Sequence, residues 1–139
     1  MGKRRIPVRR IAGAISSSAL GALALAAATA TACELPSGAR VESERIAISY
    51  WTIPAKISVG QPFALELAAC PKRGSLSFER VRLDAHMPEH RHGMNYRTKV
   101  EALGNGRFRS EGWLFHMPGR WEFIFDLGAE RLTHSVRVE

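Results

Sequence analysis

The sequence predicts an all-β fold: an immunoglobulin-like antiparallel β-sandwich of about seven strands, preceded by an N-terminal signal segment. Two observations lead to this prediction. From residue 46 onward apolar and polar residues alternate in short runs that turn residues separate, which is the pattern of half-buried strands. No amphipathic helix with a 3.6-residue period is evident after residue 33. An up-and-down barrel is the alternative architecture.

Each predicted strand has its own pattern. The clearest is 81–87, where every second residue is apolar and the residues between are charged or polar. Gly104-Asn105-Gly106 predicts a tight hairpin between the two strands around it. In chain order, the predicted strands are 46–53, 63–69, 81–87, 95–103, 107–115, 121–127 and 132–138.

Residues 1–32 predict a secretory signal. Basic residues between Lys3 and Arg10 are followed by an uncharged stretch from Ile11 to Ala32 that ends in small residues. A positive start, an apolar middle and small residues at the end are the parts of a signal peptide. A transmembrane anchor is the alternative, although the stretch holds few large apolar side chains. We therefore expect export to the periplasm, with 33–45 as a linker and 46–139 as the folded domain.

The net charge does not indicate a nucleic-acid partner. The chain has 20 Lys and Arg against 13 Asp and Glu, a net charge of +7, but five of the basic residues lie in the first ten positions. The remaining 15 are interspersed with the 13 acids, whereas binding to phosphates needs clustered cations. A length of 139 residues suits one domain and not a multidomain enzyme.

The two cysteines have two competing interpretations. Cys33 directly follows small residues, where a lipoprotein signal places its acylated cysteine, and lipidation would make the protein membrane-anchored on the periplasmic side. Alternatively, Cys33 pairs with Cys70 in a disulfide, which an oxidising compartment permits. The sequence leaves both open.

Histidine and methionine are concentrated in two short segments. Four of the five His, and every Met after Met1, lie in 86–94 or 116–117. Imidazole and thioether together are the ligands that Cu(I) prefers, and imidazole also serves Cu(II). The sequence therefore predicts a copper site, with Cu(I) favoured over Cu(II).

The spacing indicates which residues bind the metal. His90, His92 and Met94 are two apart, so an extended backbone places them on one face. The predicted hairpin can return His116 and Met117 to the same end of the sandwich. His86 is a further candidate, although it is equally well explained as a solvated side chain. Core packing competes with ligation at Met87 and Met117, and His134 is expected to be structural.

Three strings resemble the YtkA-like domain family: 87–94, 106–108 and 115–121. Members are small exported or lipid-anchored β-sandwich proteins, often linked to copper handling and to respiratory-oxidase or metal-efflux systems. The similarity covers roughly 57–138. It implies a role for His90, His92 and Met94 as a His-x-His-Gly-Met string. It also implies a role for Met117-Pro118-Gly119 and Trp121 as a Met-Pro-Gly-x-Trp string.

These observations favour an exported copper carrier or chaperone without catalytic activity, which passes copper to a partner protein. The expected ligands are His90, His92, Met94 and His116, completed by Met117 or His86. The alternative is an accessory interaction module of a membrane or respiratory complex, without metal. An enzyme is disfavoured because the chain has no Gly-x-Ser-x-Gly string and no carboxylate pair placed for acid–base chemistry.

Overall fold

The computed structural model describes Gly2 and residues 33–75, 77, 78 and 80–139. The predicted signal, 1–32, lies outside these residues apart from Gly2. The described chain forms nine strands: β1 (Ala39–Glu42), β2 (Ile46–Ile53), β3 (Phe63–Pro71), β4 (Val81–Met87), β5 (His92–Gly93), β6 (Lys99–Gly104), β7 (Arg107–Trp113), β8 (Gly119–Leu127) and β9 (Glu130–Val138). The described part of the chain has no helix with the length and apolar character that a membrane span requires.

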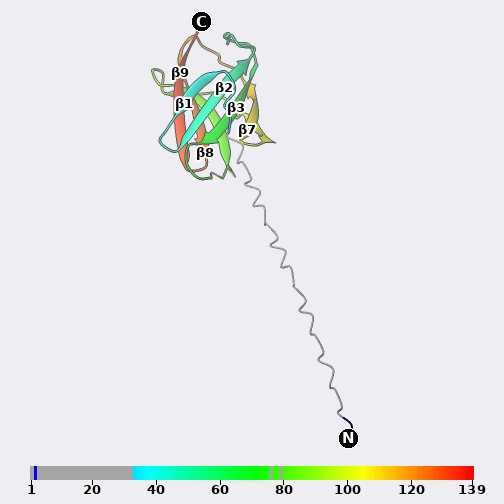
Figure 1. Cartoon of the computed structure of the whole chain (residues 1–139). Helices are drawn as coiled ribbons and strands as arrows, with labels where there is room; N and C mark the ends of the chain where they lie inside the picture. Colours follow the sequence, from blue (N-terminus) through cyan, green and yellow to red (C-terminus); the bar gives the residue numbers. More distant parts are fainter. Residues whose placement is uncertain (1, 3–32, 76, 79) are drawn as a thin grey trace. The chain divides into compact units, whose positions relative to one another are not determined.

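The strands form two antiparallel sheets that pack face to face as a sandwich (Figure 1). One sheet has the order β1-β2-β3-β7-β6 and the other the order β5-β4-β8-β9. Apart from the extra edge strands β1 and β5, this is the arrangement of immunoglobulin-like sandwiches, in which the chain changes sheet after the second, third and fifth strands. The predicted fold class is therefore confirmed.

The core between the sheets is rich in aromatic side chains. The fully buried aromatic residues are Trp113, Phe115, Trp121, Phe123 and Phe125. Three of them occupy alternate positions of β8, as the period-2 pattern of 121–127 predicts. The inward side of β4 is buried in the same way, down to Met87 at its end, which has no exposed surface.

The structure differs from the sequence-based prediction at two edges. The predicted linker 33–45 contains strand β1, which pairs with β2. Ser49 on β2 is fully buried and donates a hydrogen bond from its hydroxyl to the Pro36 carbonyl over 2.6 Å. Gly38 allows this contact, because a Cβ there would lie 2.6 Å from the Tyr50 carbonyl oxygen. Within the predicted linker, Ala39–Glu42 is therefore a strand of the sheet, and the segment before it is packed on the domain.

The second difference is at the edge of the other sheet. The two-residue strand β5 pairs with the end of β4, and the strand predicted at 95–103 begins only at Lys99. Thr98 explains this delay, because its hydroxyl donates to the Leu83 carbonyl over 2.7 Å. Residues 94–98 thus remain with β4 before the chain crosses to the other sheet. The predicted hairpin between β6 and β7 is confirmed, with Asn105 and Gly106 both at positive φ.

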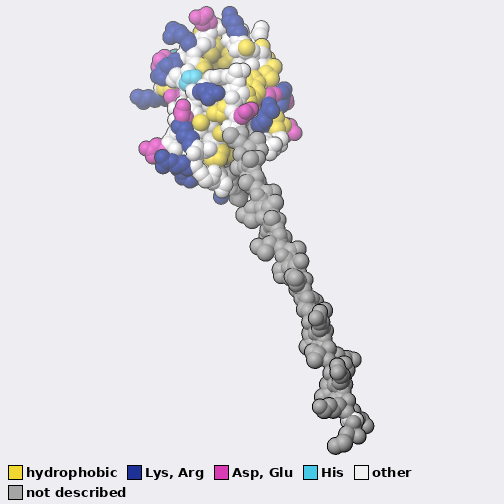
Figure 2. Space-filling model, viewed as in Figure 1, with side chains coloured by type: hydrophobic (Ala, Val, Ile, Leu, Met, Phe, Trp, Pro, Cys, Tyr) yellow, Lys and Arg dark blue, Asp and Glu magenta, His cyan; other side chains and the backbone are white. Residues whose placement is uncertain are grey.

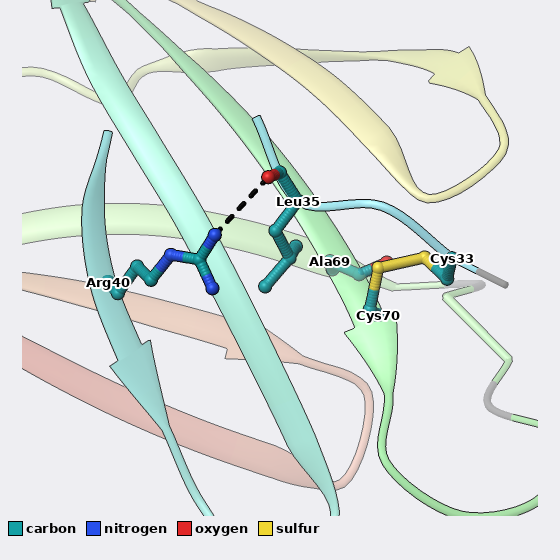
Figure 3. Close-up of a disulfide and its surroundings, with 5 residues drawn as sticks. All are labelled: Cys33, Leu35, Arg40, Ala69 and Cys70. Carbon is teal, nitrogen blue, oxygen red and sulfur yellow. Dashed lines mark hydrogen bonds between the residues drawn. A yellow bond between two sulfur atoms is a disulfide. The ribbon is translucent and has the colours of Figure 1, made fainter. Parts of the chain in front are cut away.

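Cys33 and Cys70 form a disulfide (Figure 3). Cys33 is exposed, and Cys70 is buried near the end of β3. The bridge ties the segment before β1 to the sheet, and Arg40 adds a hydrogen bond to the Leu35 carbonyl. Of the two interpretations of Cys33, this structure contains the disulfide, and the same sulfur cannot also carry a thioether-linked lipid.

Charged side chains of both signs are mixed on the surface. Figure 2 shows Lys and Arg beside Asp and Glu over the visible face of the domain, with apolar side chains between them. Asp126 illustrates this mixing, because it forms ion pairs with both Arg82 and Arg131.

Candidate metal centre

The first His/Met segment is held by a tight hairpin between β4 and β5. Pro88 follows the last residue of β4, and the His90 amide donates to the Met87 carbonyl over 3.2 Å, which closes a four-residue turn. Arg91 then takes a positive φ of 55°. These two features reverse the chain so that His92 pairs with Met87.

The second segment is a loop between β7 and β8, and its neighbours hold it at both ends. Phe115 is fully buried, and its carbonyl accepts a hydrogen bond from the Gly60 amide over 2.8 Å. Trp121 on β8 donates its indole N–H to the Met117 carbonyl over 3.0 Å. His116 lies between these two anchors and is half-buried.

The two segments meet at one end of the sandwich. The rings of His92 and His116 have centroids 5.1 Å apart, and His90 lies 5.8 Å from His92. We call these three residues the His cluster. It lies beside the start of β8, where Gly119 pairs with Val138 near the C-terminus marked in Figure 1. The structure thus brings together imidazoles that are more than twenty residues apart in sequence.

The three histidines differ in their surroundings. His92 is half-buried in β5, whereas His90 lies in the turn and is exposed. The sequence places His90, His92 and Met94 on one extended face, but the turn removes His90 from that strand. The Met94 amide donates to the carbonyl of Ala85, which faces the core. Met94 therefore shares the core-facing side of the hairpin with His92, and only these two keep the predicted alternation.

The methionines pack at the same end. Met94 and Met117 are partly buried against the core. Met87 is fully buried, and its methyl group lies 2.9 Å from where a Cβ on Gly119 would be. Of the two interpretations that the sequence leaves open for Met87, this burial is typical of core packing.

His86 and His134 lie outside the His cluster. His86 is next to Met87 on β4 and so faces the opposite side of the sheet, where its Nε2 lies 3.0 Å from Glu122 Oε1. His134 Nδ1 is hydrogen-bonded to the Tyr50 hydroxyl over 2.6 Å. Burial raises the pKa of Tyr50 to about 12. His134 thus has a structural partner, in line with the sequence-based expectation.

His116 has a feature that packing does not explain. Its Nδ1 atom is buried and, among the described residues, is the one buried side-chain nitrogen or oxygen without a hydrogen-bond partner. Leaving such an atom unpaired costs about 1–3 kcal/mol, and for that reason buried polar atoms are almost always satisfied by protein, water or an ion. The nitrogen therefore has free capacity to bind a ligand.

Oxygen donors are scarce around the His cluster. Within the described residues, no group of three or more His, Cys, Asp or Glu side chains is arranged to hold a metal ion. The carboxylates nearest to these segments in sequence have other partners: Glu89 accepts from Arg120 over 3.2 Å, Glu111 accepts from Arg109 over 3.0 Å, and Glu122 pairs with His86. A metal ion at this end would therefore have the neighbouring imidazoles of His92 and His116 and would need methionine sulfur to complete its ligands.

Trp121 is a residue of this region that the ligand chemistry of the sequence did not single out, although the resemblance to YtkA-like domains implies a role for it. Its ring centroid lies 5.9 Å from that of His92 and 5.5 Å from that of His116. The alternation of β8 assigns Trp121 to the core, and this pattern does not separate it from Trp113, which is equally buried.

Comparison of the chain with protein-family models, curated proteins and solved structures finds no match. The resemblance to YtkA-like domains stays a prediction from the quoted strings.

Proposed function

We propose that this protein is an exported, non-catalytic copper carrier that binds one copper ion at the His cluster. The observation that supports this most directly is the unpaired, buried Nδ1 of His116 at a ring distance of 5.1 Å from His92. A nitrogen ligand for a soft metal needs a free lone pair, which Nδ1 of His116 has in the Nε2-protonated tautomer, and no donor in the described part of the chain competes for it.

The donor set favours copper over other metals. His92 and His116 supply imidazoles, and Met94 and Met117 supply thioethers at the same end of the domain. Thioether ligands suit Cu(I), whereas zinc sites are built from Cys, His and carboxylates. His90 is exposed, so it can bind copper that arrives from solvent or pass it to a partner protein by ligand exchange.

The expected location is consistent with this chemistry. The sequence predicts a secretory signal before the domain, and both cysteines are engaged in a disulfide, as is common in oxidising compartments. In such a compartment thiols are poor copper ligands because they oxidise, and His with Met is the alternative donor set. Copper handling is also what the resemblance to YtkA-like domains implies.

The test is Cu(I) binding by the purified protein, measured by competition with a chromophoric Cu(I) chelator. We expect one Cu(I) per chain in the wild type and no measurable competition in the His92→Ala/His116→Ala variant. His86→Ala is the matched control, because it removes an imidazole from the opposite face of the same hairpin. Wild-type affinity in the double variant would refute the site.

The competing function is an accessory interaction module that docks on a membrane complex without metal. The described residues contain no group of three or more His, Cys, Asp or Glu side chains that could hold a metal ion, and this favours the alternative. Failure of the wild type to bind Cu(I), together with partner binding that metal removal does not change, would support this alternative.

A further inference from the structure

We infer that Trp121 belongs to the copper site, where its indole forms the apolar wall that holds the ion and makes the site selective for Cu(I). This inference rests on the function proposed above and adds a specificity-determining residue to it. It depends on the proximity of the indole to two imidazoles, those of His92 and His116, one from each His/Met segment.

Three aromatic rings surround the indole of Trp121. Phe115 stacks on one face of the Trp121 ring, with centroids 4.2 Å apart and planes inclined by 8°. The rings of His92 and His116 stand steeply to the indole plane, at 72° and 79°. Trp121 itself is fully buried. The indole therefore has the phenyl ring stacked on one face and both imidazoles beside it, and its full burial leaves it no freedom to turn away.

The indole of Trp121 has no free donor or acceptor to offer a metal ion. Its N–H is already used, because it donates to the Met117 carbonyl. Trp121 therefore presents only ring carbon to the His cluster, and it also fixes the backbone of one candidate thioether ligand. An aromatic face attracts a cation through its quadrupole and supplies no lone pair.

The surroundings of the His cluster suit Cu(I) better than Zn²⁺ or Cu(II). Zn²⁺ prefers four lone-pair donors in a tetrahedron, and Cu(II) prefers a tetragonal set of nitrogen and oxygen ligands. Around the His cluster a carbon wall occupies one side, and the neighbouring carboxylates are paired elsewhere. Cu(I) accepts few, soft ligands and is satisfied by imidazole and thioether beside an aromatic ring. The wall therefore disfavours the dications more than Cu(I).

The experiment follows tryptophan fluorescence and metal affinity together. Trp113 provides a matched control, because it too is fully buried, stacks on a phenylalanine (Phe63) and donates its indole N–H, here to Ser110. We compare Trp121→Phe with Trp113→Phe during titration with Cu(I). We expect Cu(I) to quench the emission of the wild type and of Trp113→Phe, and to leave the emission of Trp121→Phe unchanged.

Affinity tests the selectivity. Phe attracts a cation less strongly than Trp, so Trp121→Phe should weaken Cu(I) binding about tenfold relative to Trp113→Phe, a loss of about 1.4 kcal/mol. Zn²⁺ affinity should stay the same or rise. Trp121 could also affect Cu(I) affinity only by positioning Met117. In that case a double-mutant cycle would show that Trp121→Phe no longer lowers the Cu(I) affinity of the Met117→Leu variant.

The outcomes distinguish the two proposals. If the wild type binds Cu(I) tightly but its fluorescence does not respond, Trp121 is not part of the site, and the copper carrier stands. If the wild type binds no Cu(I), both proposals fail. Should Trp121→Phe not fold, the Trp51→Phe/Trp113→Phe protein keeps Trp121 as its one tryptophan and still tests the quenching.

Discussion

Removal of the Cys33–Cys70 disulfide should cost this domain a large part of its stability. The bridge joins residues 37 positions apart in sequence. In the chain-entropy model, closing a loop of this length lowers the entropy of the unfolded chain by about 13 cal/mol/K, equivalent to about 4 kcal/mol at 25 °C. Typical domains unfold with only 5–15 kcal/mol, so this is a substantial share.

The free energy of the folded state changes little in the Cys33→Ser/Cys70→Ser variant. The hydrogen bond from Ser49 to the Pro36 carbonyl and the pairing of β1 with β2 do not require the bridge. The segment before β1 should therefore stay docked, and the loss should come from the unfolded state. For a domain of this size we expect a fall in Tm of roughly 15 °C or more.

The assay is urea unfolding followed by tryptophan fluorescence, with the wild type in reducing agent as a second route to the same state. We expect the midpoint urea concentration to fall. The slope of the unfolding free energy against urea should remain similar and rise only because the uncrosslinked unfolded chain exposes a larger surface. A change in the free energy of unfolding below about 1 kcal/mol would show that the loop-closure reasoning is wrong.

Two further predictions concern titrating groups. The hydrogen bond from Arg131 lowers the pKa of Asp126 below its ordinary value of 3.8, although burial opposes this, so its stabilising effect is present above about pH 4 and is lost as the pH falls. Thermal melts between pH 5 and pH 2 should accordingly show a weaker pH dependence for Asp126→Asn than for the wild type, and equal slopes would contradict this. The raised pKa of Tyr50, about 12, means that stability is full below pH 10 and declines as the pH rises toward 12. Phenolate absorbance should therefore show a late ionisation step near pH 12 that Tyr50→Phe lacks, and a late step retained in that variant would disprove the assignment.

The fold was predictable from sequence because its strands carry strong alternation. The bounds of β2 and β4 agree with the predicted 46–53 and 81–87, since one face of each is buried and the pattern records this. β1 and β5 are short edge strands with few buried positions. Their pairing depends on tertiary contacts, such as that of Ser49 with Pro36, which no local pattern encodes.

The candidate site was predictable in part. Residue type alone indicated that the segments around His92 and His116 share a chemistry, and the structure places their rings in proximity. The direction of His86 also follows from alternation, since its neighbour Met87 faces the core. The turn position of His90 requires the positive φ of Arg91, for which the sequence has no signal. The contacts of Trp121 with His92 and His116 could not be predicted because they arise only when two loops converge, and only the resemblance to YtkA-like domains implied a role for this residue.

The ends of β3 keep two kinds of sulfur chemistry apart. Cys70 lies near one end, and Phe63, at the other, pairs with Trp113 just before the loop that carries His116. Seven steps of extended chain separate them by about 24 Å. Even fully reduced, the thiols are too distant to capture an ion held by imidazole and thioether. In the proposed copper carrier, the oxidation state of the bridge and the occupancy of the His cluster can thus vary independently.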